Sequence, residues 1–343
     1  MLELLKMLCS ANAPSGREDE VIKVITDRLD GINVQYSVYP SGNVIAALPC
    51  GKENSPRVMV QCHTDETGFM VKGHRDGGYL SISPLGISDA KDLVGKRVSV
   101  LADTLRHGSI GAVPIHLSKD KDIPSMDDLY ADVGILSKDE AEKDIPLGSF
   151  GCFDTDLELF GKDGSFISGK ALSSRIPCAV LLETIKRLKD TELDANVYFA
   201  FTVRGKLSLN GATEAYNRIL PDAVVSVAGI PANDTPDNTS PICRLGFGAA
   251  LSRSEVRYRF DESLTAQLRS VAEAEEICVQ TSRPMTEEED PNFDIFRMKN
   301  AGAGISAIRV PVRNMNSSCE AAANADVLSV ICLLYSFLKV IDV

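Results

Sequence analysis

The sequence predicts an α/β protein in which a central mixed sheet carries helices on both faces and a small β-barrel is inserted into the chain. Helices and strands alternate towards both ends of the chain, whereas its middle holds short strands with frequent turns. With 343 residues, 44% of them hydrophobic, the chain can bury two cores. We therefore expect an α/β domain built from residues 1–70 and 161–343, with residues 71–160 as the inserted barrel.

The first elements follow from local signals. Ser15 and Glu18 have the spacing of a capping box, and apolar residues then recur at helical spacing as far as Gly31. This pattern predicts a helix over about 17–30. Three β-rich runs follow at 34–39, 43–48 and 58–62, separated by turn-forming or polar segments, and they predict the first strands of the sheet.

The middle of the chain has a different texture. Turn signals such as Asp76-Gly77-Gly78, Pro84-Leu85-Gly86 and His107-Gly108 recur between short β-rich runs, with little helical periodicity. This texture is typical of a small barrel or sandwich. The alternation of helices and strands then resumes near Ser173. It predicts helices over 178–188, 264–276 and 322–338 and strands over 197–203, 223–227 and 305–310, as in a sheet covered on both faces.

Composition excludes several classes of function. The formal net charge is −12, from 36 Lys and Arg against 48 Asp and Glu, and no basic run is present, so nucleic acid is not an expected partner. Nine scattered cysteines without a Cys-x-x-Cys pair indicate free thiols in a reducing compartment, which predicts a cytoplasmic protein. Residues 1–9 do not resemble a signal peptide, and the apolar run 327–340 is shorter than a membrane span, so no membrane association is expected.

One motif indicates metal chemistry. The apolar run 58–60 leads into Gln61-Cys62-His63-Thr64-Asp65-Glu66, and residues two apart on a strand face the same side. His63 and Asp65 therefore project together from the carboxyl end of the strand, where open α/β sheets place their ligand sites. The pair suits a divalent cation, with His63 as ligand and Asp65 as the acceptor that orients it. Alone, however, a His-x-Asp pair is more often a hydrogen-bonded pair at a strand end than a metal site.

The wider sequence around this motif resembles one family. The run from His63 to Val71 is similar to the His-Met-Asp-Glu-Ile-Gly-Phe-Met-Val run of the TET-type metalloaminopeptidases, which include glutamyl aminopeptidases and proteins once labelled endoglucanases. Other segments resemble family motifs in the same order along essentially the whole chain. They are 13–18, 41–44, 111–116, 127–134, 169–172, 201–203, 234–236 and 311–313.

The resemblance implies both an activity and an assembly. Family members use two divalent ions, zinc or cobalt, to activate a shared water that attacks the scissile amide. The inserted barrel is implied to mediate dimerisation, and the dimers to assemble into a dodecamer. Each metal ligand must be a His, Asp or Glu, and this chain departs from that requirement at most of the family positions.

The bridging carboxylate, the base and one metal ligand are replaced. Where the family has Asp-Asp-Arg or Asp-Asn-Arg, with the first Asp bridging the metals, this chain has Ser173-Ser174-Arg175. Where the family has Gln-Glu-Glu, whose two Glu act as general base and metal ligand, it has Arg204-Gly205-Lys206. Gly205 cannot accept a proton, and Lys206 places an ammonium where a cation should bind.

Two further ligands are absent. Ser226 takes the position of a ligand Asp, and Asn316 that of the last ligand, a His. The four histidines are His63, His74, His107 and His116, so no histidine is available near the C-terminus. The Gly-Gly-Thr-Asp segment of the family is replaced by residues 290–294. Of the implied site, only His63, as a remnant ligand, and Asp65, as its orienting partner, remain.

These departures predict a non-catalytic homologue, acting as a peptide-binding or structural subunit of a homo-oligomer, alone or beside an active paralogue. No cofactor is expected, beyond at most one weakly bound metal at His63. Two alternatives remain: a divergent aminopeptidase that uses a single or non-family metal site, or another reaction in the same cleft. The acidic run 287–290 would supply ligands only if its loop folds over the site. We also hypothesise that Lys206 substitutes electrostatically for the lost cations, since buried carboxylates need a positive partner.

Overall fold

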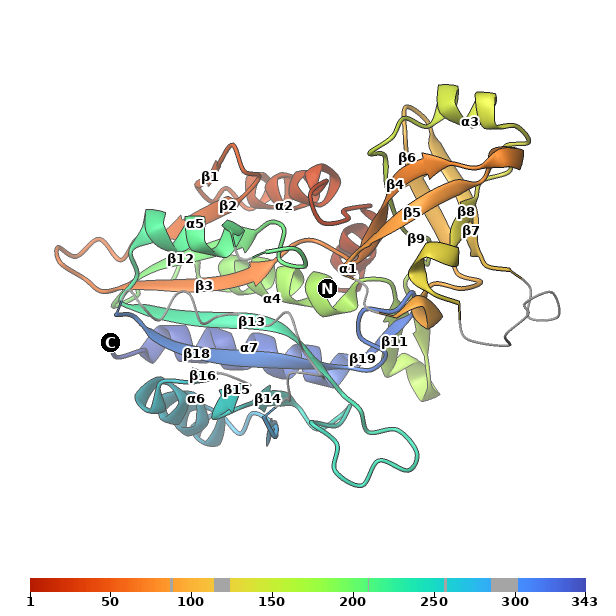
Figure 1. Cartoon of the computed structure of the whole chain (residues 1–343). Helices are drawn as coiled ribbons and strands as arrows, with labels where there is room; N and C mark the ends of the chain where they lie inside the picture. The colour runs from red at the N-terminus through yellow and green to blue at the C-terminus, as the bar shows by residue number, and fades with distance from the viewer. Residues whose placement is uncertain (87–88, 114–123, 209, 256–257, 285–301) are drawn as a thin grey trace.

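The computed structural model describes residues 1–86, 89–113, 124–208, 210–255, 258–284 and 302–343. It has the predicted fold class: a large mixed sheet with helices on both faces, and a closed β-barrel that projects from one end of it (Figure 1). The segments 287–290 and 290–294, and His116, lie outside the described residues.

The central sheet has eight strands, and its four middle strands run parallel. The order is β1 (Tyr36–Val38), β2 (Val44–Leu48), β12 (Asn196–Thr202), β3 (Arg57–His63), β13 (Ala223–Pro231), β18 (Gly304–Val312), β14 (Ala249–Leu251) and β17 (Val279–Thr281). In the register of β12 and β3, Thr202 lies opposite His63. The carboxyl ends of the middle strands therefore meet at one edge of the sheet, beside the barrel.

Helices cover both faces of this sheet because the strand residues alternate between two apolar cores. Val58 and Val60 of β3 belong to the larger core, whereas Met59, between them, belongs to the core on the other face. The larger core is shared with α1 (Leu2–Ser10), α2 (Asp19–Gly31), α4 (Leu172–Leu188), α6 (Glu262–Ala274) and α7 (Asn324–Val340). The other core packs against α5 (Asn210–Ile219).

The barrel begins directly after β3. Its closed strand order is β4 (Gly68–His74), β5 (Leu80–Leu85), β8 (Tyr130–Asp132), β7 (Leu105–Gly111), β6 (Arg97–Leu101) and β9 (Phe150–Phe153), with α3 (Lys138–Asp144) outside it. Closure leaves no unpaired strand edge. Phe69 fills the interior so tightly that a Cβ on Gly151 would lie 2.2 Å from its ring, which explains the glycine.

Smaller sheets and turns complete the fold. A three-stranded sheet contains β10 (Glu158–Phe160), β11 (Phe166–Gly169) and β19 (Glu320–Ala323), and a short hairpin contains β15 (Ser254–Glu255) and β16 (Tyr258–Arg259). Short 3-10 turns span Asp76–Gly78, Ala90–Asp92, Met126–Asp128 and Lys162–Gly164. The pairing of β11 with β19 brings Gly169 opposite Glu320, so the segment before α4 lies beside the segment before α7.

Three expectations about element boundaries were wrong. The first long helix starts at Asp19 rather than near residue 17, because the Glu18 carboxylate accepts the backbone N–H groups of Gly16 and Arg204 (3.0 and 2.8 Å) instead of closing a capping box. Residues 322–323 belong to β19, so the last helix begins two residues later than expected. Helix α4 starts at Leu172, well before the expected residue 178.

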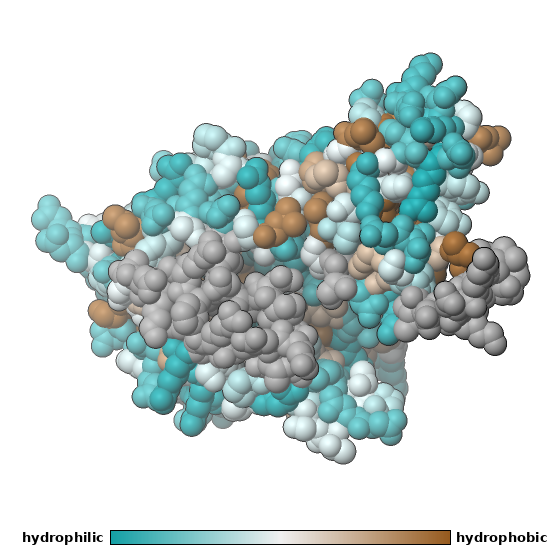
Figure 2. Space-filling view, in the orientation of Figure 1, coloured by the Kyte–Doolittle hydropathy of each residue, from teal (hydrophilic) through white to brown (hydrophobic). Residues whose placement is uncertain are grey.

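The exposed surface agrees with the composition. In the space-filling view most of the coloured surface is hydrophilic, and hydrophobic residues appear as scattered spots (Figure 2). Among the described residues, no helix combines the length and apolar character that crossing a bilayer requires.

Candidate functional site

The predicted pairing of His63 and Asp65 is confirmed. His63 Nδ1 lies 3.1 Å from Asp65 Oδ1 at the carboxyl end of β3. Asp65 is fully buried, and its two oxygens also accept the backbone N–H groups of Gly205 (2.8 Å) and Lys206 (2.7 Å). Burial alone would raise the pKa of Asp65, but the hydrogen bonds and the charge of His63 outweigh it and lower the pKa. The ionised Asp65 therefore orients the imidazole through Nδ1.

Gly205 lies directly against this imidazole. A Cβ built on Gly205 would be 2.5 Å from His63 Cβ and 2.8 Å from His63 Cγ, closer than side chains approach one another. The turn that follows β12 places it there, with Arg204 in the left-handed region (φ 61°). Any side chain at this position would have to displace the imidazole, so the family's general base does not fit beside His63 as the ring is placed here.

The Lys206 side chain extends within the site. Its ammonium donates a 2.5 Å hydrogen bond to Asn316 Oδ1, and its stem passes Gly86, where an added Cβ would lie 2.9 Å from Lys206 Cβ. Its positive charge partly offsets the effect of burial, which raises the pKa of Glu320. The partly buried lysine therefore lies between the barrel and the loop after β18, with its ammonium bonded to Asn316.

Glu320 is a site residue that the sequence analysis missed. Its carboxylate accepts hydrogen bonds from Ser173 N (2.5 Å), Ser173 Oγ (2.9 Å) and Asn316 N (2.6 Å), and the residue is 1% exposed. Burial raises the pKa of Glu320, and the charge of Lys206 is the largest influence that opposes this rise. One signal for it was available: a lone carboxylate in the run Cys319-Glu320-Ala321-Ala322-Ala323, where only a buried role explains an acid among small residues.

Ser226 lies on the same face of the sheet as His63, but it bonds to neither His63 nor Glu320 in the contacts described. Its hydroxyl is 3.3 Å from Gln61 Nε2 and 3.2 Å from Arg309 Nη1. Arg309 is fully buried, and Ser226 is 3% exposed. A neutral hydroxyl beside a guanidinium thus stands where the resemblance expects a carboxylate on a metal, and a metal cation there would be repelled by Arg309.

Other motif residues have a structural role. Glu66 points away from His63, as predicted, and pairs with Lys170 (3.3 Å) and Arg175 (3.0 Å) in the interior. It also accepts the backbone N–H of Ala13 at 2.7 Å. These contacts tie the N-terminal segment to the start of α4. The matches to the family at 13–18 and 169–172 are therefore explained by folding.

The side chains at the expected ligand positions do not suit two zinc or cobalt ions. Within the described parts of the chain, no group of three or more His, Cys, Asp and Glu side chains is arranged to hold a metal. The side chains at the expected positions are a hydroxyl at Ser173, an ammonium at Lys206, a hydroxyl at Ser226 and an amide at Asn316. The Glu320 and Asp65 carboxylates each accept three hydrogen bonds from protein atoms.

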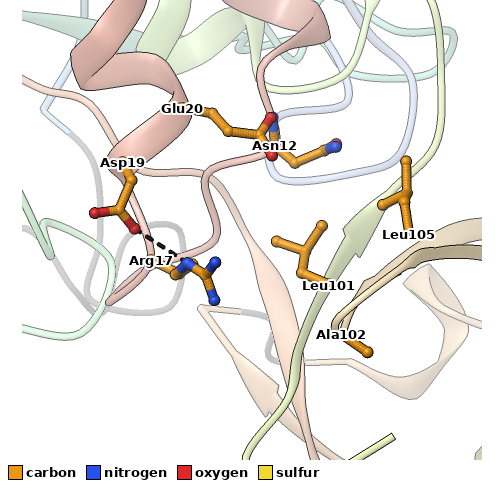
Figure 3. A pocket seen from close by; sticks show the side chains of 7 residues that line it. All are labelled: Asn12, Arg17, Asp19, Glu20, Leu101, Ala102 and Leu105. Carbon is orange, nitrogen blue, oxygen red and sulfur yellow. Dashed lines mark hydrogen bonds and ion pairs between the residues drawn. The ribbon is translucent and has the colours of Figure 1, made fainter. Parts of the chain in front are cut away.

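A separate pocket lies between the start of α2 and the β6–β7 hairpin of the barrel (Figure 3). Its lining residues are Asn12, Arg17, Asp19, Glu20, Leu101, Ala102 and Leu105. Arg17 is paired with Asp19 (3.0 Å), and Glu20 accepts the backbone N–H of Asn12 (2.8 Å). The charged groups that line this pocket therefore have partners within the chain.

One curated relative and two solved structures illustrate similarity over nearly the full length of the chain. A lysyl aminopeptidase of Pyrococcus furiosus is 26% identical, with 98% of this chain and 96% of the relative covered. The structure of a TET aminopeptidase from a marine-sediment archaeon of the Thaumarchaeota has a TM-score of 0.92 and 28% identity, covering 100% of this chain and 96% of that one. The TET1 peptidase of Pyrococcus horikoshii has a TM-score of 0.86 and 26% identity, with 99% of each chain covered.

The family model described as M42 glutamyl aminopeptidase matches residues 42–333. That range includes the whole barrel and every position of the site described above. This chain therefore belongs to the M42 glutamyl aminopeptidase family.

Proposed function

We propose that this chain is a non-catalytic member of the aminopeptidase family. The observation that carries the proposal is the contact between Gly205 and His63, since it leaves no space for a general base beside the one remaining metal ligand. The Lys206 ammonium next to Asn316 supports it, because a cation already lies among the expected ligand positions. Among the described residues of the site, no general base and no bridging carboxylate is present to activate the attacking water.

The role that remains is that of a peptide-binding or structural subunit. The TET1 peptidase of Pyrococcus horikoshii, similar over 99% of both chains, is described as forming a tetrahedron or a large octahedral shell. By this likeness we expect the chain to form a homo-oligomer, from a dimer up to a dodecamer, or to enter such an assembly beside an active paralogue. The nine cysteines are free, which supports a reducing compartment such as the cytoplasm.

A second candidate rests on the geometry of His63. Its Nδ1 is held by Asp65, and its side chain is 22% exposed, so Nε2 is the ring nitrogen left to bind a ligand from the cleft. One divalent ion bound there, with ligands from outside this set, would give a divergent aminopeptidase. This candidate keeps the family reaction but needs a base other than residue 205.

Turnover separates the two candidates. Purified protein is incubated with a panel of aminoacyl p-nitroanilides, with and without added zinc or cobalt, beside an active family member as positive control. The proposal predicts release of p-nitroaniline at the rate of the buffer blank under all conditions. Release that requires added metal and disappears in a His63→Ala variant would support the divergent enzyme instead.

A further inference from the structure

The three-stranded sheet beside the barrel has an open edge. Its strand order is β10, β11 and β19, and among the described residues β10 pairs with β11 alone. All three residues of β10, Glu158, Leu159 and Phe160, are exposed. The neighbouring strands β11 and β19 lie at the periphery of the molecule, below the barrel (Figure 1). An exposed edge strand presents backbone N–H and C=O groups with which another strand can pair.

Apolar side chains gather at this edge. Leu159 and Phe160 are 48% and 42% exposed, and Leu328 of α7 is 50% exposed. Leu328 follows Asn324 by four residues, so the two share one face of the helix. The Asn324 amide donates to Gly164 O at 2.8 Å, which places that face beside the β10–β11 turn. Since natural proteins usually cover or charge their open sheet edges, an apolar edge of this kind indicates an interface.

The charges along β10 favour one occupant of this edge, a second copy of the same strand. Asp156 and Glu158 are exposed at its start, and Lys162 is exposed directly after its end. Asp163, with a φ of 59°, lies at the tip of the turn, where the chain reverses towards β11. Antiparallel pairing of two such strands places the acidic start of each beside Lys162 of the other. Parallel pairing would place like charges side by side.

We propose that β10 pairs with β10 of a second copy of this chain, antiparallel and about a two-fold axis at Leu159. A two-fold interface uses the same patch on both copies. The two Leu159 side chains then face each other across the axis, and the two Phe160 rings lie diagonally on the other face, within the reach of aromatic side chains. The inference rests on the proposed function in one respect, because it needs the homo-oligomer but not the loss of catalysis.

The first experiment tests the register by cross-linking. A Leu159→Cys variant of the full chain is oxidised with diamide and analysed on a non-reducing gel. Since residue 159 lies on the axis, we expect a disulfide-linked dimer. Val38→Cys is the matched control, because Val38 is 52% exposed on the edge strand β1 of the central sheet. Wild-type protein shows the background from the exposed Cys278 and Cys319.

The second experiment tests the charges. The mass of the full chain is measured by size-exclusion chromatography with light scattering over a range of protein concentrations. Lys162→Glu places like charges together twice in each interface and should raise the concentration at which the assembly dissociates about tenfold. Lys52→Glu is the control, because Lys52 is an exposed lysine in the loop before β3. The control should dissociate at the same concentration as the wild type.

A cross-link of Leu159→Cys above both backgrounds, together with the weaker assembly of Lys162→Glu, supports the proposal. A variant Leu159→Cys that does not cross-link above background overturns it, as does a Lys162→Glu variant that assembles like the wild type. Either result leaves the homo-oligomer itself intact. A wild-type chain that is monomeric at every concentration overturns both the interface and the homo-oligomer. Turnover of aminoacyl p-nitroanilides would overturn the non-catalytic role alone.

Discussion

The backbone of Gly205 packs so closely against His63 that a side chain at residue 205 would overlap the imidazole. An added Cβ would lie 2.5 Å from His63 Cβ and 3.1 Å from Asp65 Oδ1. The turn after β12 therefore packs its backbone on the imidazole and donates its N–H groups to the carboxylate that orients this ring. The site is a packed hydrogen-bond network, and its parts make separate predictions.

Substitution at residue 205 is expected to destabilise the fold without creating activity. Gly205→Ala should reduce the free energy of unfolding by about 1–3 kcal/mol, because the methyl group must displace the imidazole. Gly31→Ala is a matched control, since its Cβ would meet nothing within 4 Å. Urea unfolding measures both variants. A Gly205→Glu variant that folds as well as wild type and hydrolyses aminoacyl p-nitroanilides would contradict this account.

Asp65→Asn tests the ionised carboxylate. The amide nitrogen would face an N–H donor, so we expect a loss of about 2–4 kcal/mol at pH 7. Because the folded pKa of Asp65 is lowered, its stabilisation is fully present above the unfolded pKa of about 4 and is lost as the pH falls through the folded value. The difference between wild type and variant should therefore shrink below about pH 4. A difference that stays constant down to pH 2.5 would show that charge is not involved.

Lys206→Met tests the cation whose charge offsets the effect of burial on the pKa of Glu320. Without the ammonium, the raised pKa of Glu320 should rise further. The folded state then binds the proton of Glu320 more tightly than the unfolded state does, so ionised Glu320 costs the folded state more free energy. The destabilisation should be largest near pH 8, at about 2 kcal/mol, and should decrease towards pH 5 as Glu320 takes up its proton. Lys23→Met is the control, because Lys23 pairs with Asp27 at the surface. An equal penalty at both pH values would exclude the coupling.

Glu66→Gln tests the buried ion cluster beneath the site. Lys170 and Arg175, 3% and 0% exposed, would lose their carboxylate partner. Leaving such charges unpaired in the interior costs about 3–5 kcal/mol. Unfolding in guanidinium chloride measures the loss. A variant as stable as wild type would mean that water or rearranged neighbours satisfy both cations.

Much of the fold could be predicted from the sequence because strand periodicity and turns are local signals. The pairing of His63 with Asp65 followed from the two-residue spacing on β3, and the opposite direction of Glu66 followed from the same rule. The start of α2 was placed too early, because Glu18 bonds to Arg204, a residue that lies far away in the sequence. The short helix α5 was not predicted, since Asn210 and Gly211 weaken its local helical signal.

Glu320 shows where sequence reasoning reached its limit. The family comparison directed attention to the positions where ligands are lost, at Ser173, Lys206 and Asn316. Glu320 meets Ser173 only because β19 pairs with β11, a contact between segments about 150 residues apart that no local pattern reveals. The effect of the Lys206 charge on Glu320 could be recognised only after that strand pairing was known.

The metal content of the chain tests the central claim most directly. Protein purified without chelator, from medium supplemented with zinc and cobalt, is analysed by inductively coupled plasma mass spectrometry, with His63→Ala as control. The account predicts well under one ion per chain, and no change in thermal stability after treatment with a chelator. About two zinc or cobalt ions per chain that are lost in the control variant would contradict it.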